Sequence, residues 1–138
     1  MSPVIEQAVQ ARVVASVPRM ETVPATLRYD LQDPFAVRMA FPPPATLEGT
    51  EVTWEFSREL LATGVNEPVG LGDVRVRPFG YGRTVLEFHA PEGTAMVHLR
   101  TSELRRFLER AQDLVPAGRE HLFLDLDHDL TELLRDAS

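Results

Sequence analysis

The chain lacks several features that would assign it to common classes of protein. It has no cysteine, which excludes disulfides, thiolate metal sites and cysteine nucleophiles. No apolar run approaches the roughly 18 residues needed to span a bilayer. The first residues lack the basic start and the long apolar stretch of a signal peptide. Lysine is absent too, so all 14 basic residues are arginine, which is no functional signal by itself. We expect a cytoplasmic protein.

Length, net charge and missing catalytic motifs further restrict the classes of protein to which the chain could belong. At 138 residues the chain is expected to form one domain over 1–138, rich in strands over 1–100 and helical over 101–138. Its net charge is −7, which argues against a general phosphate-binding surface but leaves room for one basic face. The sequence contains neither G-x-S-x-G nor H-E-x-x-H. We therefore predict no enzymatic activity and no cofactor.

Alternation of apolar and polar residues predicts a series of half-buried strands. Residues 4–15 and 22–29 are weaker candidates, the second interrupted by Pro24, and 42–49 reads as a proline-rich loop. The turn at 91–94 joins the last two strands as a hairpin. Short alternating strands favour an antiparallel sheet that is curled or closed. The residues expected on the buried faces are Phe35, Val37, Met39, Phe41, Val52, Trp54, Phe56, Val74, Val76, Leu86, Phe88, Ala95, Val97 and Leu99.

Helix signals follow two of these strands. Ser57 can cap a short helix over 58–62 that stops at Gly64. A longer helix begins near Ser102 and ends through Pro116 and Gly118, and a final helix opens in "DLDHD" (125–129). The fold class is therefore α+β, an antiparallel β-barrel-like core with C-terminal helices. The apolar face of the longer helix comprises Leu104, Phe107, Leu108, Ala111 and Leu114, and that of the final helix Leu126, Leu130, Leu133 and Leu134.

The stretch "DVRVRPFGYGRT" (73–84) contains the main candidate binding residues. Arg75 and Arg77 alternate along a predicted strand, and Phe79 and Tyr81 lie next to glycines in a turn. Arginine beside exposed rings is typical of single-stranded nucleic-acid binders, and arginine and tyrosine are also enriched where proteins meet. The acids nearby, Glu87 among them, would repel a phosphate backbone. An ordinary solvated strand and turn fits these residues as well.

Two other groups resemble metal or acid–base sites. Asp125, Asp127 and Asp129 with His128 have the opening spacing of a calcium loop, but its later ligand positions are occupied by Leu130 and Asp136. A capped helix start explains these acids better. The predicted hairpin places His89 and His98 on one outer face, where they could approach Met96 and Glu87 across the strands. A solvated strand face is the favoured interpretation.

Six segments, taken in order, are characteristic of one protein family and cover nearly the whole chain after residue 25. They are "LRYDLQDPFAV" (27–37), "WEFSRELLATG" (54–64), "GLGDVRVRP" (70–78), "PEG" (91–93), "FLERAQDLVPAGRE" (107–120) and "DLDHDL" (125–130). Together they resemble the SsgA-like family of actinobacterial sporulation and cell-division proteins, and most closely its SsgB type.

The resemblance implies a non-enzymatic adaptor that acts at the division septum. SsgB-type proteins are expected to recruit the tubulin-like GTPase FtsZ, together with an SsgA-type partner, and to assemble as a homotrimer. The family fold is similar to that of the Whirly single-stranded nucleic-acid-binding proteins. The alternative function is therefore the binding of single-stranded DNA or RNA on the same scaffold. No motif transfers the partner site, and the residues we expect there are Arg75, Arg77, Phe79 and Tyr81.

Overall fold

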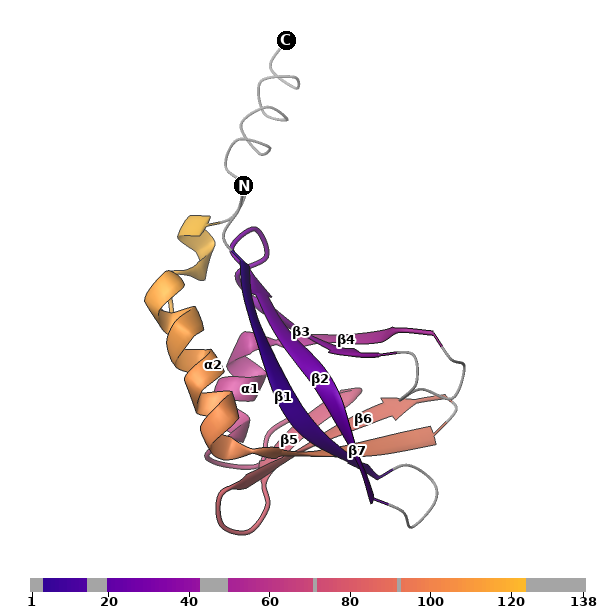
Figure 1. Ribbon diagram of the computed structural model, residues 1–138. Helices are drawn as coiled ribbons and strands as arrows, with labels where there is room; N and C mark the ends of the chain where they lie inside the picture. The colour runs from indigo at the N-terminus through magenta and orange to yellow at the C-terminus, as the bar shows by residue number, and fades with distance from the viewer. Residues whose placement is uncertain (1–3, 15–19, 43–49, 71, 92, 124–138) are drawn as a thin grey trace.

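The computed structural model describes residues 4–14, 20–42, 50–70, 72–91 and 93–123. These residues form one seven-stranded antiparallel sheet in the order β4-β3-β2-β1-β7-β6-β5, with two helices and a 3₁₀ turn (Figure 1). Within these ranges, no helix is both long and apolar enough to cross a membrane. The elements are β1 (Val4–Val14), β2 (Met20–Asp30), β3 (Ala36–Phe41), β4 (Val52–Ser57), α1 (Arg58–Gly64), β5 (Val74–Pro78), β6 (Arg83–Ala90), β7 (Gly93–Arg100), α2 (Thr101–Leu114) and η2 (Glu120–Phe123).

The sheet is strongly curled. Aromatic rings from strands near its two ends meet on its inner face. Trp54 on β4 and Phe88 on β6 have ring centroids 4.8 Å apart, although β3, β2, β1 and β7 separate those strands in the sheet. Phe41 and Phe56 also pack against Phe88. The predicted antiparallel, curled α+β core is confirmed. More buried positions alternate with exposed ones along β1 and β4.

Two predictions about the strands were wrong. Phe35 is half exposed rather than buried, because it precedes β3 in a turn that contains Pro34. Pro24 does not interrupt β2, which runs unbroken and pairs Pro24 with Gln10 of β1. On its other side β2 pairs with β3 only over Thr26–Arg28, so the strand has no neighbour there that would need the missing proline N–H.

The predicted helices are confirmed where the structure describes them. The Ser57 hydroxyl accepts a hydrogen bond from the Leu60 N–H and caps α1. The helix α1 links the two edge strands β4 and β5, and α2 packs on β1 and β7 (Figure 1). The final predicted helix lies outside the described residues. The apolar face of α2 faces the core through Leu104, Phe107, Leu108, Ala111 and Leu114.

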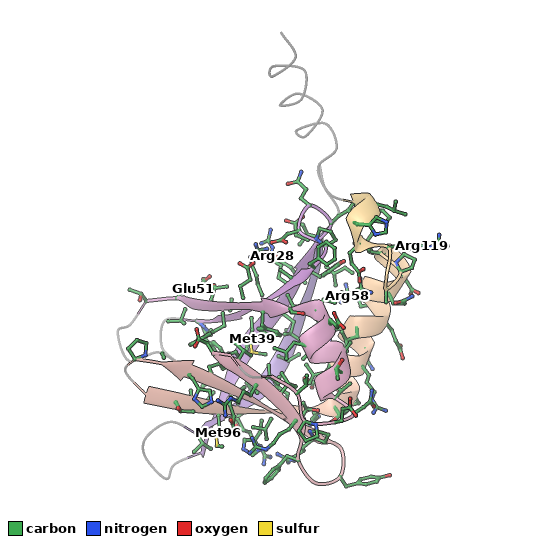
Figure 2. The ribbon with its side chains drawn as sticks, turned by 180° about the vertical axis from the view of Figure 1, so that it is seen from behind. Arg28, Met39, Glu51, Arg58, Met96 and Arg119 are labelled. Atoms are coloured by element: carbon green, nitrogen blue, oxygen red, sulfur yellow. The ribbon has the colours of Figure 1, made fainter. Side chains whose placement is uncertain are left out.

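A buried arginine ties the helices to the sheet (Figure 2). Arg58, the first residue of α1, is only 5% exposed. It donates to the Tyr29 hydroxyl at 3.1 Å and to the Gln112 side chain at 3.3 Å, and it lies 3.5 Å from the Glu120 carboxylate. Burial raises the pKa of Tyr29, whose hydroxyl donates to the Pro34 carbonyl at 2.8 Å. The sequence signals did not reveal this cluster, because Arg58 reads as an ordinary first-turn residue.

Candidate partner-binding surface

The β5–β6 hairpin presents the four residues predicted to face a partner. Its turn is closed by a hydrogen bond from the Phe79 N–H to the Arg83 carbonyl at 2.9 Å. Gly80 and Gly82 flank the tip with positive φ angles of 61° and 76°, which non-glycine residues rarely adopt. Between them Tyr81 is fully exposed, and Phe79 is 49% exposed. The turn predicted from the glycines is confirmed, and it directs one ring entirely into solvent.

The two strand arginines lie on the same outer face but differ in their partners. Arg75 is exposed and lies opposite Glu87 in the strand register, but it forms no ion pair with any described residue. The Arg77 guanidinium forms an ion pair with the Glu87 carboxylate, which also receives a hydrogen bond from His89 at 3.3 Å. Partial burial raises the pKa of Glu87, but the hydrogen bonds from Arg77 and His89 outweigh it and hold that pKa below its ordinary range. The charge of Arg77 is therefore already compensated within the chain.

The histidines of this face are held apart. His89 contacts Glu87 on its own strand and Thr94 across the hairpin, where the Thr94 hydroxyl lies 3.1 Å from the ring. His98 lies opposite Val85, and Glu87 lies opposite Met96. The contact between His98 and Glu87 that the sequence suggested is therefore not made. The ring of Phe79 meets His98 edge-on, with centroids 5.0 Å apart. Phe79 thus folds back onto the sheet and leaves Tyr81 alone at the tip.

Arginines from other strands surround His98, and the sequence patterns did not predict this. Arg12 on β1 is opposite His98, and Arg83 on β6 is opposite Arg100 on β7, so all four side chains share the outer face. Burial is the main cause that lowers the pKa of His98, and the charges of Arg83, Arg77 and Arg12 lower it further. Positive charges therefore gather on the outer face of the sheet around His98.

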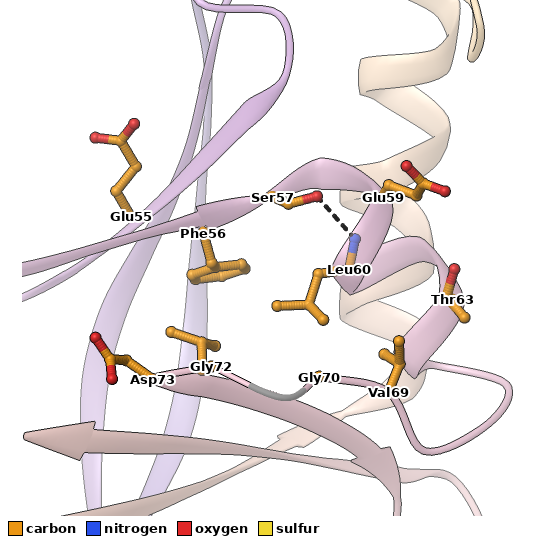
Figure 3. Close-up of a pocket in the computed structure, with 11 residues that line it drawn as sticks. Glu55, Phe56, Ser57, Glu59, Leu60, Thr63, Val69, Gly70, Gly72 and Asp73 are labelled. Atoms are coloured by element: carbon orange, nitrogen blue, oxygen red, sulfur yellow. Dashed lines mark hydrogen bonds between the residues drawn. The ribbon is translucent and has the colours of Figure 1, made fainter.

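A groove lies between the edge strand β4, the helix α1 and the start of the other edge strand, β5 (Figure 3). It has a volume of about 500 Å³, an apolar floor that includes Phe56 and Leu60, and carboxylates at Glu55, Glu59 and Asp73. Figure 3 shows the Ser57 hydroxyl directed at the Leu60 N–H. That hydroxyl accepts the cap hydrogen bond of α1, so the fold explains its place in the groove.

No metal centre is present among the described residues, which contain no group of three or more histidine and acidic side chains arranged to hold an ion. The aspartates of the considered calcium-like sequence, Asp125, Asp127 and Asp129, lie outside the described residues together with His128.

Comparison with known proteins places this architecture in a family. Residues 23–120 match the family model described as Streptomyces sporulation and cell division protein, SsgA. The chain is 39% identical to the sporulation-specific cell division protein SsgB of Streptomyces coelicolor, covering 99% of this chain and 100% of that protein. It is 41% identical to the protein of the same name from Salinispora tropica, covering 94% and 92%.

Solved structures agree with this assignment. A structure from a study of SsgB mutations that correlate with longitudinal cell division in Streptomyces coelicolor superposes with a TM-score of 0.78 at 37% identity, covering 90% of this chain and 98% of that chain. The SsgA-like sporulation-specific cell division protein of Thermobifida fusca superposes with a TM-score of 0.82 at 32% identity, covering 95% and 96%. The chain therefore belongs to the SsgA family of sporulation and cell-division proteins, and its role lies in cell division.

Proposed function

We propose that the protein is a non-enzymatic adaptor that recruits FtsZ to septation sites during sporulation-specific division. The observation that supports this proposal is the β5–β6 tip, where Tyr81 is fully exposed and Phe79 half exposed, on the hairpin that carries the exposed Arg75. Large exposed rings and arginines are the residues that dominate protein–protein binding energy. Arg75, Arg77, Phe79 and Tyr81 form the proposed partner-facing surface, with Arg77 held in place by Glu87.

Family resemblance supports the remaining parts of the proposal. The protein acts at the division septum with an SsgA-type partner, as a homotrimer of a single domain spanning 1–138, on a fold of the Whirly type. Sedimentation of the purified chain tests the trimer. The acidic net charge of −7 and the Arg77–Glu87 ion pair favour a protein partner over a nucleic-acid strand, because both reduce attraction for phosphates.

The test is a titration of the purified chain with FtsZ and GTP. Substituting Arg75→Gln together with Tyr81→Ser removes a charge and a ring and leaves both members of the Arg77–Glu87 ion pair in place. Truncating a hot-spot residue costs about 2 kcal/mol or more, so we expect binding to weaken roughly 30-fold. The control is Phe35→Ser, which removes a ring that is 50% exposed from a turn on another part of the surface.

Two results would contradict the proposal. One is FtsZ binding by the double variant that equals that of the wild type. The other is strong, salt-dependent binding of a fluorescent single-stranded oligonucleotide with no binding of FtsZ, because log affinity falls steeply with log salt when phosphates supply the energy. That outcome would favour the nucleic-acid function instead.

A further inference from the structure

A small arginine-lined hollow lies on the outer face of the sheet, next to the β5–β6 tip. It has a volume of about 130 Å³ and takes its walls from β1, β2, β6 and β7. The face turns away from the aromatic core. Arg12 and Arg100 are exposed there, whereas His98 and Leu99 are buried. We call this feature the arginine hollow; its lining residues are Arg12, Arg83, Arg100, Gln10, Thr22, His98 and Leu99.

The charge of the arginine hollow is not balanced from within the described part of the chain. Arg12, Arg83 and Arg100 make no ion pair and no side-chain hydrogen bond with any other described residue. Among the described residues, no carboxylate lines the hollow. The nearby Arg77 differs in this respect, since Glu87 neutralises it. Three guanidinium groups gathered in a protein of net charge −7 repel one another, and a bound anion would relieve that repulsion.

The lining groups define the chemistry of the anion. Guanidinium groups present flat, forked donors that match the two oxygens of a carboxylate. The Gln10 amide and the Thr22 hydroxyl, both exposed, add neutral donors at the rim. His98 is only 8% exposed and forms part of the wall. A hollow of this size has room for one or two carboxylates rather than for a large ligand.

Guanidinium groups bind phosphates as well as carboxylates, but the surroundings favour the carboxylates of a protein over the phosphates of a nucleic acid. Phe79 packs edge-on against His98, so the hollow and the exposed tip form one continuous surface. A single-stranded nucleic acid needs successive stacking rings. At this tip only Tyr81 is fully exposed. An acidic peptide with an apolar residue beside its carboxylates fits both parts: the carboxylates reach the arginines and the apolar side chain meets the rings.

We infer that the arginine hollow binds the carboxylates of an acidic segment of the protein partner. The inference rests on the proposed function, because the same partner would contact Phe79 and Tyr81. It adds the chemical class of the segment and three further contact residues, Arg12, Arg83 and Arg100.

A labelled decaglutamate peptide tests the hollow without FtsZ. Fluorescence anisotropy at low salt compares the wild type with the Arg12→Gln/Arg83→Gln variant, and we expect at least a tenfold loss of affinity in the variant. The matched control is Arg106→Gln/Arg119→Gln, which removes the same charge from exposed arginines on and after α2. Figure 2 shows Arg119 at the helical end of the molecule. The control variant should bind like the wild type.

A second readout reports binding at the hollow directly. NMR titration of His98 should show its pKa rise when decaglutamate is bound, because the anion offsets the arginine charges that lower this pKa. The inference is overturned if the wild type does not bind decaglutamate, if the control loses as much affinity as the Arg12→Gln/Arg83→Gln variant, or if the pKa of His98 does not move. Preference for a single-stranded oligonucleotide over decaglutamate would also overturn it.

The FtsZ titration separates this inference from the proposed function. If FtsZ binding depends on Tyr81 but not on Arg12 and Arg83, the adaptor function stands and the hollow is not part of the interface. If decaglutamate binds the hollow and FtsZ does not bind at all, the anion site stands and the proposed partner is wrong.

Discussion

The contact between α1 and β5 makes a sharp prediction about stability. Gly64 is the last residue of α1 and is buried. A Cβ atom at this position would lie 2.2 Å from Val76 Cγ1 and 2.3 Å from Val76 Cβ. Ordinary carbon–carbon contacts are about 3.5–4.0 Å, so the helix and the strand would have to separate by more than 1 Å. Val76 has little freedom to yield, since it is 1% exposed and exchanges two backbone hydrogen bonds of 2.9 Å with Val69.

The change in stability expected for Gly64→Ala is the sum of two opposed effects. Overpacking a tight contact costs about 1–3 kcal/mol, and replacing a helical glycine by alanine returns up to about 1 kcal/mol. We expect Gly64→Ala to destabilise the fold by about 2 kcal/mol, since this overlap lies at the severe end of that range. For a chain of this length the melting temperature, Tm, should fall by roughly 6–8 °C.

Differential scanning calorimetry of two variants tests this reasoning. Gly72→Ala is the matched control, because a Cβ there has no atom within 4 Å, and its effect should stay within about 0.5 kcal/mol. If the two variants melt at the same temperature, α1 does not pack on β5 as described. The result also bears on the partner surface, since β5 carries Arg75 and Arg77.

Two further predictions concern buried polar groups. Arg58→Met should lower the free energy of unfolding in urea by about 3 kcal/mol, because it leaves the largely buried Glu120 carboxylate without its cation; a loss below about 1 kcal/mol would contradict this. His98 has a lowered pKa in the fold, so the unfolded chain binds its proton more readily. Wild-type stability should therefore fall with pH from about 6.5 down to that lowered pKa, relative to His98→Gln. Urea unfolding of both proteins above and below this pH range measures the effect. If the stabilities of the wild type and His98→Gln change with pH in parallel, the prediction is refuted.

Local patterns predicted most of the fold, because alternation and capping act over a few residues. The inner faces of β4, β5, β6 and β7 follow the predicted alternation, and Ser57 caps α1 as its position indicated. Phe35 was misplaced because the alternation continues for one residue beyond the strand, into the turn. Pro24 was misjudged because its cost depends on whether a neighbouring strand needs its N–H, and no local pattern reports neighbours.

Only the part of the candidate site that lies within one short stretch of sequence could be predicted. Arg75 and Arg77 share a face because they are two residues apart on one strand, and the glycine-flanked tip follows from the same stretch. The arginine hollow joins Arg12 of β1 to Arg83 and Arg100 of the β6–β7 hairpin, which lies far from β1 in the sequence. A register shift of one residue between β1 and β7 would turn Arg12 away from His98 and onto the inner face. Strand pairing, and not any short motif, is therefore what gathers these cations, so a search for local basic motifs would have missed them.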